Sequence, residues 1–194
     1  ALGRLSGDQE WRYIRQHFNV EEFAAFYAVN QCISNWDGFF NNYFIFHDTG
    51  NTGKWEIYPW DTDKTWGDFD GTSDRYDWYS MPLTFGSEGD RPGGSLSRMR
   101  RGPFGGQSWW RPPGHLSGPL LGNPGFRQVF LKKLEHLLNT VFTEEKFLPI
   151  IDSLENKLGP EVLFKYGANN SWASDTFRND IESLRNQVKN RRNF

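Results

Sequence analysis

The apolar residues that follow Asn19 recur at the spacing of one face of a helix. Asn19 is a good helix cap, and Glu21 and Glu22 suit the first turn, where the helix dipole is positive. A stripe with steps of three and four residues follows, and the same stripe carried forward one turn reaches Asp37. The pattern therefore predicts a helix that buries one face and presents Asp37 at its end. The stripe consists of Phe23, Phe26, Tyr27, Asn30, Ile33 and Ser34.

The pattern then changes from helical spacing to strand alternation. Residues 42–47 alternate and are rich in β-forming side chains, and residues 54–58 return in the same way. Residues 48–53 between them contain Asp, Gly and Asn, which favour a turn. We therefore expect a β-hairpin that joins two polar segments of the chain, one ending at Asn42 and the other beginning at Asp61.

Periodicity is lost over residues 68–118, where glycine is frequent and proline dipeptides appear. Because a stretch of this length without regular structure is usually a functional lid or a disordered segment, we expect a long irregular Gly/Pro-rich insert. The helical pattern returns at Asn123 and Pro124, which supply a cap and a first-turn proline. Residues 1–194 are thus expected to form a single, mainly helical α+β domain. Its other helices are expected from Ser6 or Asp8 to His17, over residues 143–158 and over residues 175–188.

Composition narrows the classes of protein. The net charge of −2 gives no reason to expect nucleic acid or an anionic membrane as a partner. Cys32 is the single cysteine, so neither an intrachain disulfide nor a cysteine-based zinc site is expected. No apolar run is long enough to span a membrane, no export signal is recognisable, and localisation stays open. Nine tryptophans favour either a bulky aromatic core or aromatic walls around a groove.

The two polar segments contain the residue types that phosphoryl transfer requires. Such a reaction needs a base for the incoming hydroxyl and hard oxygen ligands for Mg²⁺. Asp37, an Asn five positions later at Asn42, and then Asp61 after a hairpin repeat the order in which protein kinases supply these groups. We therefore expect Asp37 to be the catalytic base. Asn42 and Asp61 are expected to bind the nucleotide and its metal ion, with Asp63 as a further metal ligand.

Other uses of these residues remain open. Residues 61–65 also fit the Asp-x-Asp-x-Thr pattern of haloacid dehalogenase-like phosphatases, in which the first Asp attacks phosphorus. That class requires a buried parallel strand before Asp61, whereas Pro59 ends the expected strand. A third hypothesis is a non-catalytic module whose aromatic groove binds a protein or glycan. The sequence has no EF-hand spacing, no His-x-x-x-His pair and no Walker-type phosphate loop.

Several short motifs stand out along the chain. They are Asn19-Val20-Glu21-Glu22-Phe23, Asn35-Trp36-Asp37, Asn41-Asn42-Tyr43-Phe44-Ile45-Phe46, Pro59-Trp60-Asp61-Thr62-Asp63 with Gly67, and Pro119-Leu120-Leu121-Gly122-Asn123-Pro124-Gly125-Phe126-Arg127. Their order resembles that of the CotH family, the spore coat protein H-like atypical kinases. The resemblance extends from about Val20 to the C-terminus and is sharpest from Asp37 to Gly67.

The resemblance implies a fold like the C-terminal lobe of a protein kinase, with the hairpin carrying the metal site. It also implies ATP and Mg²⁺ or Mn²⁺ as cofactors, and γ-phosphoryl transfer to Ser or Thr hydroxyls of protein substrates, often on spore coats or cell surfaces. By motif position Asp37 matches the catalytic Asp, Asn42 and Asp61 match metal-binding residues, and Asp63 is their neighbour.

The resemblance also implies that the N-terminal lobe of the family is missing here. Family members carry a β-rich N-terminal lobe that contacts the nucleotide, and here only residues 1–19 precede the match. We therefore expect a C-terminal lobe alone, with reduced activity. The cation that the other lobe supplies would have to come from Lys64 or from an arginine of the insert, namely Arg75, Arg98, Arg100 or Arg101.

Overall fold

The chain folds into six α-helices, a short 3-10 turn and one two-stranded antiparallel sheet, as seen in a computed structural model that describes residues 2, 4–66, 81–87, 114–167 and 170–193. This confirms the mainly helical α+β class. Most of the expected 68–118 insert lies outside the described residues. The elements are α1 (Gly7–His17), α2 (Val20–Cys32), η1 (Asp37–Phe39), β1 (Tyr43–His47), β2 (Trp55–Pro59), α3 (Ser117–Gly122), α4 (Pro124–Thr140), α5 (Glu144–Tyr166) and α6 (Ser171–Asn193).

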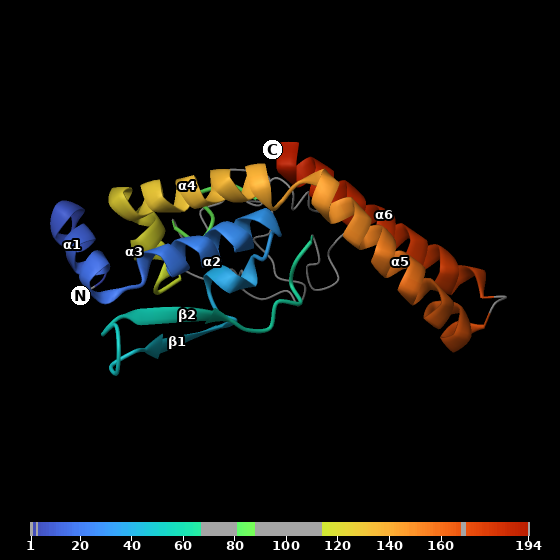
Figure 1. Ribbon diagram of the computed structural model, residues 1–194, viewed down its shortest axis with the longest axis horizontal. Coiled ribbons are helices and arrows are strands. Elements are labelled where there is room, and N and C mark those ends of the chain that lie inside the picture. Colours follow the sequence, from blue (N-terminus) through green and yellow to red (C-terminus); the bar gives the residue numbers. More distant parts are fainter. Residues whose placement is uncertain (1, 3, 67–80, 88–113, 168–169, 194) are drawn as a thin grey trace, which may run out of the picture.

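The elements divide into a body and an arm (Figure 1). In the body, α2 lies between α4 on one side and the β1–β2 hairpin on the other. Helices α5 and α6 run side by side and project away from the body, and the end of α6 returns to it. Among the described residues, no helix is long and apolar enough to cross a membrane.

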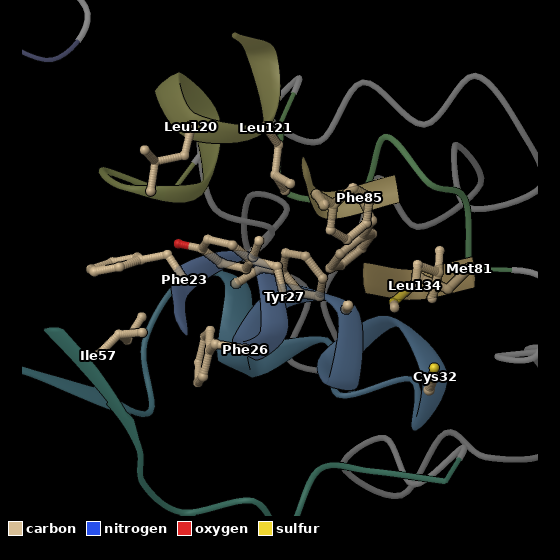
Figure 2. Close-up of a cluster of buried hydrophobic side chains, with 14 of the residues drawn as sticks. Phe23, Phe26, Tyr27, Cys32, Ile57, Met81, Phe85, Leu120, Leu121 and Leu134 are labelled. Atoms are coloured by element: carbon tan, nitrogen blue, oxygen red, sulfur yellow. The ribbon is translucent and has the colours of Figure 1, made fainter. Parts of the chain in front are cut away.

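Helix α2 is the centre of the hydrophobic core because it is covered on nearly all sides. Phe23 and Tyr27 are fully buried, and their neighbours come from the hairpin, from α3 and α4, and from residues 81–87 (Figure 2). Tyr27 stacks on Phe39 of η1 at a centroid distance of 5.5 Å. Aromatic side chains thus form much of the hydrophobic core, and this core packs against the η1 turn that contains Asp37.

The expected end of the second helix was wrong. Helix α2 ends at Cys32, because Ser34 takes a left-handed backbone conformation with φ 52°. The N–H of Asn35 donates to the Asn30 carbonyl at 2.9 Å and that of Ser34 donates to the Gln31 carbonyl at 3.4 Å. These two bonds form a Schellman motif, which closes a helix and redirects the chain. Asp37 therefore lies on a separate turn, η1, beyond the helix.

The end of α6 holds this helix terminus in place. Arg191 is buried, and its guanidinium donates to the carbonyls of Gln31 and Met81 at 2.9 and 2.7 Å. Gln187 Nε2 donates to Ser34 Oγ at 3.0 Å. Burial lowers the pKa of Arg191 to about 10, so the guanidinium remains charged at neutral pH. A cation at the carbonyl end of α2 is favourable for the helix dipole.

Helix α1 ends at His17 as expected, α5 extends beyond its expected end to Tyr166, and α6 extends beyond both expected ends, from Ser171 to Asn193. Asn123 caps α4 as predicted, since its Oδ1 accepts from the N–H groups of Gly125 and Phe126. Helix α3 begins at Ser117, inside the last residues of the expected insert. Helix α5 continues through Pro160 to Tyr166 although proline disfavours a helix interior. The packing of α5 against α6 overrides that local preference.

Burial of Cys32 makes a prediction about stability at high pH. Burial raises the pKa of its thiol from 9.0 to about 11, with Arg191 opposing the change more weakly. The folded state therefore holds the proton more tightly than the unfolded state, and stability is lost as pH rises from about 9 through 11. We expect this thiol to contribute a loss of about 2 kcal/mol by pH 11.

The measurement is urea denaturation at pH 8 and pH 11 for the native chain and for Cys32→Ala. The variant should lose less stability between the two pH values, because Tyr27, whose pKa burial also raises, is common to both proteins. Equal losses would contradict the assignment to Cys32.

Candidate functional site

The hairpin brings Asn42 and Asp61 together at its open end. The strands pair with Tyr43 opposite Pro59 and His47 opposite Trp55. The ladder continues one residue further, because the Trp60 N–H donates to the Asn42 carbonyl at 3.0 Å. Because the two strands are equal in length, Asn42, which precedes β1, lies next to Asp61, which follows Trp60. This confirms the hairpin that the sequence predicts.

The side chain of Asn42 links the two polar segments. Its Nδ2 donates to Asp37 Oδ2 at 2.7 Å and to the backbone carbonyl of Asp61 at 3.1 Å. Asn41 Nδ2 lies 3.4 Å from the other carboxylate oxygen of Asp37. Because both amide hydrogens of Asn42 point to these acceptors, its Oδ1 is directed elsewhere. No described residue donates a hydrogen bond to that oxygen.

The η1 turn orients Asp37, which is 9 % exposed. Asn35 Nδ2 donates to Asn30 Oδ1 at 3.1 Å, and the Gly38 N–H donates to Asn35 Oδ1 at 3.3 Å. A Cβ on Gly38 would lie 2.6 Å from Asn30 Nδ2, so the turn fits against these amides only with glycine at this position. Two buried asparagines and a glycine therefore set the direction of the Asp37 side chain.

A contact from far along the chain fixes the other end of η1. Ser117 Oγ, at the start of α3, lies 2.8 Å from the carbonyl oxygens of both Phe39 and Gly86. Gly114 sits directly on the Phe39 carbonyl, since an added Cβ would approach that oxygen to 2.2 Å. Contacts from the start of α3 and from residues 81–87 thus fix the position of the η1 turn.

Three residues around the hairpin end take left-handed backbone conformations that non-glycine residues seldom adopt. Asn42 and Asp61 both have φ 49°, and Trp66 has φ 59°. The Trp66 N–H donates to the carbonyl of Ile33 at 2.8 Å, which ties the segment after Asp61 to the end of α2. Such conformations cluster at functional sites because the surrounding structure must hold them in place.

The remaining predicted residues lie at the edge of this arrangement. Asp63 is exposed, and its carboxylate lies 3.6 Å from Lys64 Nζ. Among the described residues, no three His, Cys, Asp or Glu side chains gather as a metal-binding group. Gly67 lies outside the described ranges, as do the arginines considered as substitutes for a missing cation: Arg75, Arg98, Arg100 and Arg101.

The donor set fits a hard divalent cation held by few protein ligands. The Asn42 Oδ1 atom and the exposed carboxylate of Asp61 are both hard oxygen donors. Mg²⁺ is usually bound by one or two carboxylates together with substrate phosphates and water, so it does not need a cluster of three acidic side chains. Two side-chain amides contact the Asp37 carboxylate, and the Asn42 amide also reaches the backbone of Asp61.

Aromatic side chains border the site on the outward face of the hairpin. Phe44, Phe46, Tyr58 and Trp60 are all exposed and lie on the face opposite α2. The rings of Phe44 and Trp60 meet at a centroid distance of 5.2 Å, immediately beside Asn42 and Asp61. The exposed rings therefore form an aromatic edge beside the two polar segments.

Sequence reasoning missed the residues that position Asp37. Asn30 was interpreted as part of an apolar stripe, and Gly38 and Ser117 were not singled out. A buried asparagine in an otherwise apolar stripe, together with a glycine directly after Asp37, was a usable signal. The contact between Ser117 and Phe39 joins residues 78 positions apart and has no local signal.

The fold and the site define a helical α+β domain with a polar centre at a hairpin end. A family model described as "CotH kinase protein" matches residues 4–194, and the chain therefore belongs to the CotH family. The match begins earlier than the resemblance in the motifs indicated. Inner spore coat protein H of Bacillus subtilis (strain 168) is 25 % identical over 181 residues, which are 93 % of this chain. These residues span 41 % of that relative.

Proposed function

We propose that this chain carries the catalytic and metal-binding half of an atypical protein kinase. In this proposal it transfers the γ-phosphoryl group of ATP to Ser or Thr hydroxyls of a protein, with Mg²⁺ or Mn²⁺. The observation that carries the proposal is the Asn42 amide, which contacts both the Asp37 carboxylate and the Asp61 backbone. Membership in the CotH family supports the same reaction class.

The residues divide the chemistry between them. The Asp37 carboxylate accepts the proton of the substrate hydroxyl as its oxygen attacks the γ-phosphorus and the bond to the β-phosphate oxygen breaks. Asn42 holds Asp37 through Nδ2 and offers Oδ1 on the opposite side of its amide to the cation. Asp61 supplies the main carboxylate ligand, and Asp63 supports it. A bound divalent cation would neutralise charge on the phosphates.

The hairpin limits the phosphatase alternative. Strand β2 ends at Pro59 and runs antiparallel to β1, and Trp60 separates its end from Asp61. The phosphatase class needs a parallel strand that ends at its nucleophile. A binding module remains the second candidate, because the exposed aromatic face beside Trp60 could bind a protein or glycan without catalysis. The Bacillus subtilis relative is named as an inner spore coat protein, and we propose a spore coat as the setting of either function.

A metal-dependent binding assay tests the proposal without knowledge of the protein substrate. Isothermal titration of the chain with ATP should show binding that requires Mn²⁺ and disappears with EDTA. In Asp61→Asn the affinity should fall by at least about tenfold, because a neutral amide replaces the charged carboxylate that would bind the cation. Glu135→Gln, on the exposed side of α4, removes the same charge away from the site and should bind normally.

Activity then separates a kinase from a binding module. Labelled phosphate from ATP should enter protein hydroxyls only with Mn²⁺ or Mg²⁺, and Asp61→Asn should not support this transfer. Equal ATP affinity in the native chain and Asp61→Asn would reject the proposed metal site. Release of phosphate from small esters without ATP would favour the phosphatase instead.

A further inference from the structure

The loop of residues 61–66 is fixed at both ends, although the side chains of Asp61 and Asp63 on it are exposed. At its start, Asn42 Nδ2 donates to the Asp61 carbonyl at 3.1 Å. At its end, the Trp66 N–H donates to the Ile33 carbonyl at 2.8 Å. The backbone that carries both carboxylates is therefore held from two sides.

The attachment at the end of the loop also includes the Trp66 ring. This ring stacks on Phe142 at a centroid distance of 6.0 Å, and its centroid lies 5.6 Å from that of Phe147. The two phenylalanine rings meet edge to face at 5.1 Å, and Phe142 is buried. Phe142 lies between α4 and α5, and Phe147 lies near the start of α5. The end of the loop is thus packed against the base of the arm.

Consecutive arginines at the end of α6 hold both partners of Trp66. Arg191 donates to the Gln31 carbonyl at 2.9 Å, near the end of α2 and two residues before Ile33. Arg192 Nη1 donates to the Phe142 carbonyl at 2.6 Å. One helix end, far from the loop in sequence, therefore fixes the backbone partner and the ring partner of the same tryptophan.

We infer that Trp66 is a positioning residue for the cation ligand Asp61, and that the end of α6 acts on the loop through it. This inference rests on the proposed function, in which Asp61 binds the cation. A cation binds more tightly to a ligand whose backbone is already ordered, because less conformational entropy is lost on binding. Removing the Trp66 ring weakens one of the two attachments that supply this order. Asp37 stays in place, because other contacts hold the η1 turn.

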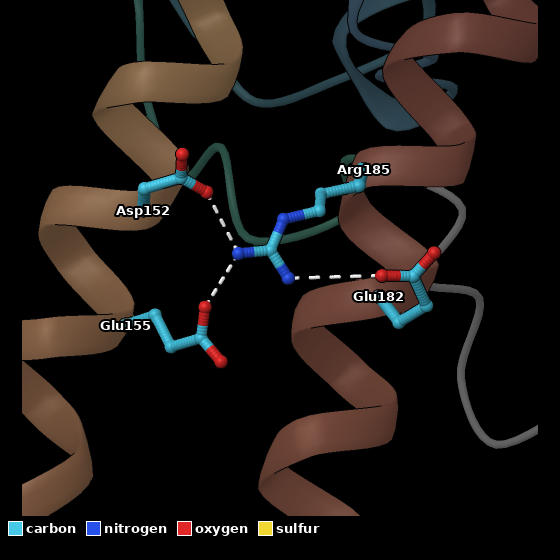
Figure 3. A network of polar contacts seen from close by, with 4 residues as sticks. All are labelled: Asp152, Glu155, Glu182 and Arg185. Carbon is cyan, nitrogen blue, oxygen red and sulfur yellow. Dashed lines mark hydrogen bonds and ion pairs between the residues drawn. The ribbon is translucent and has the colours of Figure 1, made fainter.

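Another arginine of α6 provides a comparison within the same arm. Arg185 reaches across to Asp152 and Glu155 of α5 (Figure 3). Both acidic residues lie further along α5 than Phe147, so this contact joins the two helices away from the base of the arm. A change at Arg185 is therefore expected to loosen the arm but not the loop.

Titration calorimetry with Mn²⁺ and ATP tests the positioning role. In Trp66→Leu the dissociation constant should rise by about tenfold or more, as for other residues that orient a metal ligand. Trp66→Phe keeps an aromatic ring against Phe142 and should recover most of the native affinity. Trp11→Leu is the matched control, because Trp11 is also a partly buried tryptophan but packs on Gly125 of α4. It should bind with native affinity even where its melting temperature falls.

Turnover separates positioning from damage to the whole domain. Trp66→Leu should raise the KM for ATP with Mn²⁺ and leave kcat near the native value, because Asp37 is held independently of the loop end. A variant that was only less stable would lose kcat in proportion to its unfolded fraction and keep its KM. A loss confined to kcat in Trp66→Leu would therefore overturn the inference.

Arg192→Met tests the link to α6, with Arg185→Met as its control. Arg192→Met should weaken the binding of ATP with Mn²⁺, whereas Arg185→Met should not. Because Trp66→Leu and Arg192→Met release the same attachment, the double variant should bind no more weakly than Trp66→Leu alone. Additive losses would overturn the role given to the end of α6.

Hydrogen exchange without nucleotide measures the attachment itself. The amides of residues 61–66 should exchange faster in Trp66→Leu than in the native chain or in Trp11→Leu. Unchanged exchange in Trp66→Leu, native affinity in this variant, or an equal loss of affinity in Trp11→Leu would each overturn the inference. If the native chain bound no ATP with Mn²⁺, the proposed function would fail, and with it the cation role of Asp61. The exchange result would still decide whether Trp66 fixes the loop.

Discussion

Replacing Asp37 by asparagine is expected to reduce phosphoryl transfer by about 10²- to 10⁴-fold, because the variant cannot accept the proton of the attacking hydroxyl. Affinity for ATP and Mn²⁺ should change by less than about threefold, because the proposed cation ligands Asn42 and Asp61 are unchanged. The substitution keeps the size of the side chain and one oxygen that can accept from Asn42 Nδ2, which lies 2.7 Å from the native carboxylate.

The measurement is the rate of labelled phosphate transfer at saturating ATP, together with ATP affinity by titration calorimetry. Asn41→Ala is the matched control, because the Asn41 side chain makes only the longer 3.4 Å contact with the Asp37 carboxylate, and this variant should lose much less activity. If Asp37→Asn kept native turnover, Asp37 would not be the base. If ATP affinity fell in parallel with turnover, Asp37 would act in binding rather than in proton transfer.

The second large effect is expected at Gly114. In Gly114→Ala the new methyl group would lie 2.2 Å from the Phe39 carbonyl oxygen and 2.4 Å from Ser117 Oγ. Both atoms belong to buried structure, so α3 or the η1 turn must move. We expect a loss of about 2–3 kcal/mol in the free energy of unfolding, as for other overpacked interiors.

Urea denaturation followed by tryptophan fluorescence measures this loss. Gly122→Ala is the control, because nothing lies within 4 Å of a Cβ added at the end of α3, and its stability should stay within about 0.5 kcal/mol of native. Gly114→Ala should also reduce any Asp37-dependent activity, since Phe39 is two residues from Asp37 in the same turn. If Gly114→Ala were as stable as the native chain, the neighbouring atoms would accommodate the methyl group at no cost, and the prediction would be wrong.

Local signals in the sequence were sufficient for the starts of α1, α2, α4 and α5 and for the hairpin, but not for those of α3 and α6. The Asn123 cap works through hydrogen bonds to residues two and three positions later, so neighbours in sequence decide it. The hairpin is similar, because strand alternation and a turn between Asp48 and Gly53 fix the pairing. Once that pairing is set, Asn42 and Asp61 must meet.

Helix ends were harder to predict because they depend on packing. The apolar stripe continues past Cys32, yet the left-handed Ser34 closes α2 there. Gln187 of α6 contacts the Ser34 hydroxyl from 153 residues away, and periodicity carries no information about such a partner. At α5 the opposite occurs, since packing against α6 carries the helix beyond Pro160.

By itself, the sequence determined the α+β class, the family, and the meeting of Asn42 with Asp61, because each can be inferred from short motifs, residue spacing and local turn signals. Only the tertiary structure decided how Asp37 faces Asn42, since η1 is held by Ser117, by residues 81–87 and by the core around Tyr27. It also decided which apolar residues of α5 are left uncovered. In both η1 and α5, burial depends on elements that are distant in sequence. The spacing of residues within one segment therefore does not predict it.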